Sequence, residues 1–182
     1  MSIGMKRGTV YLEPHQSEWE RAAEETIHTL KSILGSVAVD IQHIGSTSIR
    51  TIRAKPIIDI VVAVNDYELI LSKRDVLENA DIIFRFDERP EQLLFVMGDF
   101  EKDTRSHHIH VVIYGSDEWN NYINFRDYLN SNTEAAREYE AVKLRLAEQY
   151  PDDRIAYTDG KQEIIDRLLK KACVWKRKQL SK

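Results

Sequence analysis

The first run of regularly spaced hydrophobic residues predicts an α-helix near the start of the chain. Between Ser17 and Leu34, apolar residues recur three and four positions apart, which is the period of one helix face. Ser17 and Glu20 have the spacing of a capping box, in which each side chain binds a backbone N–H of the other residue. Gly35 follows the last apolar position, where glycine commonly ends a helix. We therefore expect a helix that begins at Ser17 and ends before Gly35.

Five short apolar stretches predict β-strands. Two of them, residues 37–45 and 56–64, come before a helical pattern over residues 67–80. The second stretch is rich in β-branched residues and opens with Pro56, which the first position of a strand tolerates. Three further stretches follow, at residues 81–88, 92–100 and 106–115. Because these three are consecutive, we expect them to pair as an antiparallel meander.

The last third of the chain has a helical pattern. Helices are expected around residues 119–129, over residues 133–149 and from about residue 159 to residue 178. The order of elements predicts an α+β fold, with a mixed sheet of about five strands packed by helices. No repeat or Pro/Gly-rich linker interrupts the chain, so we expect a single domain over residues 1–182.

Composition limits the partners of this protein. The net charge is -4 and the pI is near 5.9, so extensive nucleic-acid binding is not expected. The single cysteine, Cys173, excludes an internal disulfide and fits a reducing compartment. No apolar run approaches the length of a membrane span, and the first residues lack the apolar core of a signal peptide. We expect a cytoplasmic protein that binds neither nucleic acid nor membrane.

One carboxylate, Asp59, stands in the middle of an apolar strand, where an unpaired charge is costly. The preceding strand ends in Gly45 and Ser46, and glycine lets a phosphate approach the backbone N–H groups of a turn. Ser46 and Thr47 add hydroxyl donors. A short connection can thus bring a phosphate-holding turn beside a carboxylate that is a natural metal ligand. The same residues also fit a plain helix N-cap beside a carboxylate that backbone groups satisfy.

A second group of polar side chains lies on the last predicted strand. His108 and His110 are two positions apart and share one face, whereas His107 points to the other. Two imidazoles on one face are typical of metal ligands, phosphate-binding donors or an acid/base pair. The histidine-triad hydrolases need a third histidine where Val112 stands, and the paired His-x-Thr/Ser motifs of two-histidine phosphoesterases are missing. Neither of these enzyme classes fits.

Four stretches together resemble the GrpB family, whose fold is similar to that of the nucleotidyltransferase superfamily. They are QHIGSTSIRTIRAKPIIDIVVAV, SHHIHVV, FRDYLNSNTEAAREYEAVKLRLA and the tyrosine and lysine of YTDGKQEII. The resemblance extends from about Val10 to Ala172. It implies a nucleotidyltransferase-like sheet with a helical C-terminal third. A related domain is fused to dephospho-CoA kinase in some bacteria, which implies a link to nucleotide or coenzyme metabolism. The shared positions are His43, Gly45, Ser46, Thr47, Lys55, Pro56, Asp59, His107, His108, His110, Arg126, Lys143 and Lys161.

The sequence departs from the family after the Gly-Ser-Thr element. The family usually has Val-Pro-Gly-Leu there, whereas residues 49–52 of this chain read Ile-Arg-Thr-Ile. The turn is therefore expected to be less sharply defined, and Arg50 adds positive charge near the expected phosphate.

A second departure concerns the metal ligands of working nucleotidyltransferases, which carry two alternating acidic residues on one strand and hold two divalent cations. Asp59 fills the first acidic position, but Val61 fills the second. His108 and His110 stand where the partner strand would supply a third carboxylate. One carboxylate and two imidazoles suit a single zinc, nickel or manganese ion better than two magnesium ions. They also suit a site without metal, in which Asp59 orients a histidine.

We therefore predict a cleft that binds a nucleotide or another phosphorylated small molecule. A divalent metal ion (zinc, nickel, manganese or magnesium) is the expected cofactor. Three functions stay open: a nucleotidyltransferase, a non-catalytic nucleotide- or coenzyme-binding module, and a metal-assisted hydrolase. The predicted catalytic and metal-binding residues are Asp59, His108 and His110. The predicted ligand-binding residues are His43, Gly45, Ser46, Thr47, Lys55 and Arg126.

Overall fold

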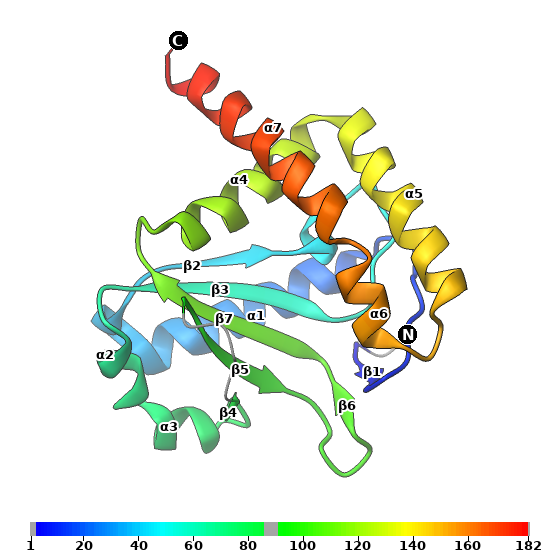
Figure 1. Ribbon diagram of the computed structural model, residues 1–182. Coiled ribbons are helices and arrows are strands. Elements are labelled where there is room, and N and C mark those ends of the chain that lie inside the picture. Colours follow the sequence, from blue (N-terminus) through cyan, green and yellow to red (C-terminus); the bar gives the residue numbers. More distant parts are fainter. Residues whose placement is uncertain (1–2, 86–90, 182) are drawn as a thin grey trace.

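A mixed five-stranded β-sheet forms the middle of the computed structural model, which describes residues 3–85 and 91–181 (Figure 1). Its strands are β2 (Ala38–Ile44), β3 (Ile58–Val64), β4 (Ile83–Arg85), β5 (Leu93–Met97) and β7 (His107–Ile113). They follow the order β2-β3-β7-β5-β4 across the sheet. The pair β3 and β7 is parallel, whereas every other neighbouring pair is antiparallel. The predicted α+β class, mixed sheet and antiparallel meander are confirmed.

The predicted strand over residues 81–88 is shorter in the structure. It covers Ile83–Arg85 as β4, and the remaining residues 86–88 of the prediction lie outside the described residues.

The inner strand β3 is apolar because helices cover both of its faces. α1 (Ser17–Leu34) packs on the face that carries Ile60. α4 (Asp117–Ser131) packs on the opposite face, where its Trp119 contacts the cluster that contains Val61. Two buried faces explain the nearly continuous run of β-branched residues, which a strand with one solvated face would not need.

The first helix has the predicted bounds but a different N-terminus. Gln16 occupies the N-cap position of α1, and its side chain makes no capping hydrogen bond. The predicted capping box is wrong, because Ser17 already has helical geometry and its hydroxyl donates to Glu18 instead. Gly35 ends the helix with a φ of 53°, as expected of a glycine at this position.

The helical pattern over residues 67–80 corresponds to two short helices, α2 (Tyr67–Leu71) and α3 (Arg74–Glu78). Ser72 lies at the break, where its hydroxyl donates to the carbonyl of Leu69. A serine that bonds its own local backbone in this way competes with helix continuation.

The C-terminal third forms four helices beside the sheet (Figure 1). The helices are α4, α5 (Thr133–Gln149), α6 (Arg154–Asp159) and α7 (Gln162–Leu180). The bounds of α5 agree with the prediction, and α7 begins three residues after the expected start near Asp159. α6 was not predicted, because six residues are too few to show a helical period. Asp153 starts α6 by accepting a hydrogen bond from the N–H of Ala156.

These helices pack on the long connection between β2 and β3. The connection begins with a 3₁₀ turn, η2 (Ser46–Ser48). After it, Ile49 and Ile52 are buried in a cluster that includes Tyr139 of α5 and Leu168 of α7. The connection therefore joins the sheet to the helical third.

A two-stranded ribbon, β1 (Met5–Lys6) with β6 (Thr104–Arg105), was not predicted. Strands of two residues are too short to show alternation. None of the described helices is long and apolar enough to cross a membrane.

Candidate binding cleft

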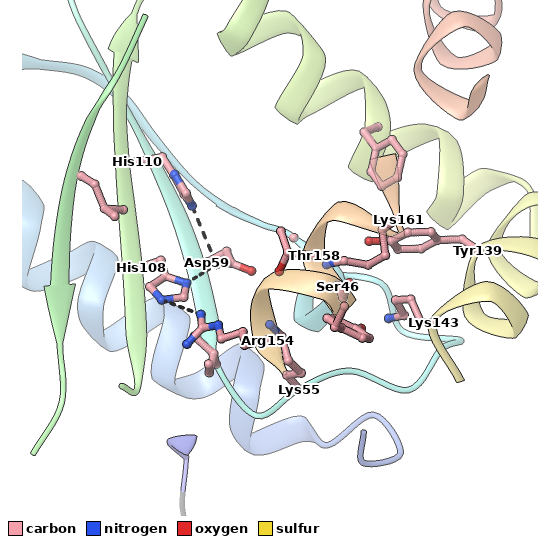
Figure 2. Close-up of a pocket in the computed structure, with 15 residues that line it drawn as sticks. Ser46, Lys55, Asp59, His108, His110, Tyr139, Lys143, Arg154, Thr158 and Lys161 are labelled. Carbon is pink, nitrogen blue, oxygen red and sulfur yellow. Dashed lines mark hydrogen bonds and ion pairs between the residues drawn. The ribbon is translucent and has the colours of Figure 1, made fainter. Parts of the chain in front are cut away.

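A cavity of about 430 Å³ opens where β3 and β7 face helices α5 and α6 (Figure 2). Helix α7 contributes its N-cap residue, Lys161. We call this cavity the cationic cleft. Its polar lining comprises Ser46, Lys55, Asp59, His108, His110, Tyr139, Lys143, Arg154, Thr158 and Lys161.

Gly45 allows the turn after β2 to lie directly against Asp59. The residue has a φ of 69°, in the left-handed region that side chains disfavour. A Cβ atom added at this position would also collide with the Asp59 carboxylate. The Gly-Ser turn and the strand-borne carboxylate are therefore one structural unit, and the predicted proximity of the two is confirmed.

Asp59 receives both imidazoles of the neighbouring strand. The parallel register of β3 and β7 pairs Asp59 with His108. The Asp59 Oδ1 atom lies 3.1 Å from His108 Nδ1 and 3.8 Å from His110 Nε2. Burial alone would raise the pKa of Asp59, but hydrogen bonds from the two histidines outweigh it and hold the pKa well below its usual range. Asp59 is thus an ionised carboxylate whose charge is partly satisfied.

The outer nitrogens of the two imidazoles also have partners. His108 Nε2 lies 3.2 Å from a guanidinium nitrogen of Arg154, and His110 Nδ1 lies 3.3 Å from the amide nitrogen of Gln92. A guanidinium and an amide N–H₂ can only donate, so these two ring nitrogens accept and the protons stand on the Asp59 side. Burial lowers the pKa of His108, and Asp59 offsets this only in part. His108 is therefore a neutral imidazole at pH 7.

This arrangement does not fit a metal ion shared by Asp59, His108 and His110. A metal needs a lone pair from each imidazole, and here the two lone pairs already face Arg154 and Gln92. Within residues 3–85 and 91–181, no group of three or more His, Cys, Asp or Glu side chains could hold a metal ion. The three predicted ligands do lie together, but as a hydrogen-bonded carboxylate–imidazole cluster.

Four cations share the described lining of the cleft with this one carboxylate (Figure 2): Lys55, Lys143, Arg154 and Lys161. The ammonium groups of Lys55 and Lys161 lie 5.1 and 4.5 Å from the centre of the Tyr157 ring. Neither ammonium group forms an ion pair or a hydrogen bond with a described residue.

Burial lowers the pKa of Lys55 to about 7 and that of Lys161 to about 8. The nearby charge of Arg154 contributes to both decreases, whereas Asp59 partly offsets them. Both lysines therefore titrate near neutral pH.

Lys143 and Tyr139 form the wall contributed by α5. Burial lowers the pKa of Lys143 to about 7, and its ammonium donates to the carbonyl of Arg53. Burial raises the pKa of Tyr139 to about 12, although a hydrogen bond with Ser46 partly offsets it. Lys143 thus fixes the connection before β3, and Tyr139 remains a neutral hydroxyl beside Ser46.

Three of the predicted ligand-binding residues lie outside the cleft: His43, Thr47 and Arg126. His43 pairs with Ile60, so its side chain is on the α1 face of the sheet, opposite to Asp59. Its Nε2 atom lies 2.9 Å from the Thr47 hydroxyl. Arg126 donates to the His43 carbonyl and pairs with Asp127. Each of the three has a partner within the fold, and their ligand-binding roles stay predictions.

Arg154 and Thr158 were not among the sequence-predicted site residues. Both belong to α6, whose surroundings read as a polar loop in the sequence PDDRIAYTDG. His107 points to the far face of β7 as predicted, and its Nε2 atom lies 3.2 Å from the hydroxyl of Thr26 on α1. Burial lowers the pKa of His107 to about 4, as expected of a core histidine.

Comparison with known sequences identifies relatives along nearly the whole chain. The sequence profile of the GrpB family, described as GrpB protein, matches residues 9–171. The glutamate-rich protein GrpB of Alkalihalophilus pseudofirmus is 38% identical over 170 residues, which are 92% of this chain and 98% of that protein. The protein YqkA of Bacillus subtilis is 33% identical over 165 residues, and this chain spans 47% of its length.

Solved structures confirm the fold. The conserved protein GrpB from Enterococcus faecalis is similar with a TM-score of 0.79 and 28% identity, covering 88% of this chain and 98% of that one. The Cid1 poly(U) polymerase, in its MgGTP-bound structure, has a TM-score of 0.51 and 14% identity. The match covers 74% of this chain and 44% of Cid1. The likeness to Cid1 concerns the fold alone and confirms the predicted nucleotidyltransferase-like architecture.

Proposed function

This chain belongs to the GrpB family, and we propose that its cationic cleft binds the phosphates of a nucleotide or a similar phosphorylated small molecule. The observation that carries the proposal is the surplus of cations over carboxylates in the described lining. Lys55 and Lys161 face the cleft without a carboxylate on either ammonium group.

An ammonium group that leaves water without a partner loses hydration energy, and the lowered pKa values of both lysines reflect this cost. A bound phosphate would restore charge compensation and hydrogen bonds at once. Arg154 adds a guanidinium fork, which suits two phosphate oxygens, and Ser46 adds a hydroxyl donor. Several cations at one site favour a ligand with more than one phosphate group.

A nucleoside triphosphate is the first ligand to test. Cid1, which shares the fold, is a poly(U) polymerase whose structure holds MgGTP. We propose that this chain binds a nucleotide, and we do not propose that it transfers a group with two metal ions. Val61 stands at the second acidic position and is fully buried in an apolar cluster with Trp119 and Val112. A second metal-binding carboxylate is therefore missing from β3, and the space around Val61 is already filled.

Affinity for an anion should fall as the pH rises from 6.5 to 9. Lys55 and Lys161 bind an anion in their charged forms, which disappear as the pH passes their pKa values of about 7 and 8. We expect the dissociation constant for tripolyphosphate to increase about 10-fold or more over this range, because each lost charge–charge hydrogen bond is worth about 1.5–3 kcal/mol. Titration calorimetry at several pH values measures this change.

The ligand cannot cause that trend by itself, because phosphate groups gain negative charge as the pH rises. Binding near pH 7.5 should also take up protons, since the anion raises the pKa of both lysines. Calorimetry in buffers of different ionisation enthalpy detects this uptake. Lys31→Met, on the exposed side of α1, should leave the pH profile unchanged. No binding of tripolyphosphate or ATP at pH 6.5 would refute the proposed function.

A further inference from the structure

A second cavity, of about 300 Å³, adjoins the cationic cleft and has a mainly apolar lining. It lies between α4 and α7, which pack against each other. Tyr122 and Phe125 line it from α4, and Ile165 and Leu169 line it from α7. We call it the apolar cavity.

The two cavities share a wall. Gly45 and Phe125 line both of them, and the Phe125 ring packs edge-on against Tyr139 of the cleft at a centroid distance of 5.4 Å. A chain of polar contacts runs along the same boundary. His110 contacts Gln92, whose amide oxygen accepts from the Tyr122 hydroxyl at 2.8 Å. A ligand anchored in the cleft therefore lies directly beside the apolar cavity, with Gly45 and Phe125 at the boundary between the two.

The two cavities also have opposite charge. The described lining of the cleft carries four cations and one carboxylate, whereas that of the apolar cavity carries Glu91 and Glu118 but no lysine or arginine. Phosphate is therefore favoured in the first cavity and repelled from the second. Glutamate oxygens instead accept hydrogen bonds from N–H groups.

From this arrangement we propose that the apolar cavity binds a planar, N–H-bearing ring of the same ligand whose phosphates lie in the cationic cleft. The inference rests on the proposed function and narrows its ligand to the class of nucleotides, as opposed to phosphorylated sugars or inorganic polyphosphate. Tyr122 and Phe125 provide the aromatic surface for the ring, and Leu169 closes the cavity on the α7 side. Phe125 stands at the junction of ring and phosphates.

The test compares ATP and GTP with tripolyphosphate, which has the phosphates but no ring. We expect the wild-type protein to bind at least one of the nucleotides about 10-fold more tightly than tripolyphosphate, as burial and stacking of a base provide. Leu169→Trp, which fills the apolar cavity, should remove this preference and leave tripolyphosphate binding unchanged. Leu169→Ala keeps the cavity open and is the matched control, which should retain at least half of the preference.

The results distinguish a failure of this inference alone from a failure of the proposed function. Equal affinity of the wild-type protein for nucleotides and tripolyphosphate would overturn the inference and leave phosphate binding intact. A nucleotide preference that survives Leu169→Trp would overturn it as well. Absence of all binding would remove the proposed function and the inference together. Should Leu169→Trp fail to fold, Asn121→Trp fills the same cavity from α4 and serves in its place.

Discussion

Replacing Lys55 by methionine should make the protein more stable and at the same time strongly weaken its anion binding. In the folded chain the ammonium of Lys55 is largely removed from water and contacts no described carboxylate. A methionine of similar length keeps the contact with Tyr157 without a charge that has to be desolvated. We expect the melting temperature to rise by about 5 °C near pH 6.5, and tripolyphosphate affinity to fall about 100-fold. Thermal unfolding and titration calorimetry measure the two effects.

The stabilisation by Lys55→Met should depend on pH, because Lys55 has different pKa values in the folded and unfolded chain. The folded-state pKa of Lys55 is about 7, whereas an exposed lysine titrates near 10.5. Between these values the unfolded chain binds more protons than the folded one, so this lysine makes wild-type stability increase with pH. Lys55→Met lacks that contribution, and its advantage should shrink as the pH approaches 10.

Lys161→Met should also stabilise the protein and weaken anion binding. Its stabilising effect should begin to shrink near pH 8, the folded-state pKa of Lys161. Lys31→Met, on the exposed surface, is the control and should change neither quantity. A destabilised Lys55→Met variant that still binds tripolyphosphate would mean that this lysine supports the fold instead of the ligand.

Gly45→Ala should be among the most destabilising single-methyl additions in the protein. The added Cβ atom would collide with the Asp59 carboxylate. The alanine would also have to adopt a φ of 69°. A φ of 69° combined with a ψ of -170° is essentially restricted to glycine and costs another residue about 1–3 kcal/mol. The collision adds to this cost, so we expect a loss of about 3–4 kcal/mol in the free energy of unfolding. Chemical denaturation measures this loss.

Gly115 provides the matched control. Its φ is 75°, close to that of Gly45, but a Cβ atom added there meets nothing within 4 Å. Gly115→Ala should therefore cost only the conformational part, about 1 kcal/mol. Equal losses at the two positions would show that the contact between the Gly-Ser turn and Asp59 tolerates a methyl group, against the close approach described above.

The fold was largely predictable because its longer strands are apolar stretches that stand out in the sequence. The β-branched run of β3 needs two covered faces. The three predicted strands that correspond to β4, β5 and β7 pair as a meander in the sheet, as their order predicts. The unpredicted elements are those with little pattern. The six residues of α6 and the two-residue strands β1 and β6 are held by tertiary contacts that no local period records.

The candidate site was only partly predictable, because its chemistry depends on which atoms meet. The resemblance to the nucleotidyltransferases placed His108 and His110 on the strand beside Asp59, and the structure agrees. The metal expectation rested on one carboxylate and two imidazoles meeting at one site. In the structure the outer nitrogens of these imidazoles face donors of Arg154 and Gln92. Neither Arg154 nor Gln92 lies in the four stretches that resemble the GrpB family.

Strand alternation explains why part of the family motif lies elsewhere. His43 is two residues from Gly45 in sequence, but its side chain leaves β2 on the face opposite to Asp59. Proximity along a strand does not by itself place a side chain in the cleft.

The ring of Tyr157 has a further consequence, for the kinetics of unfolding. The lysines on this ring come from opposite ends of the chain: Lys55 precedes β3, and Lys161 lies at the start of α7. A polyphosphate bound by both would act as a reversible cross-link between the sheet and the last helix. Such a link has to break before the C-terminal helices can separate from the sheet. The bound ligand would then extend the lifetime of the native protein in addition to shifting its equilibrium.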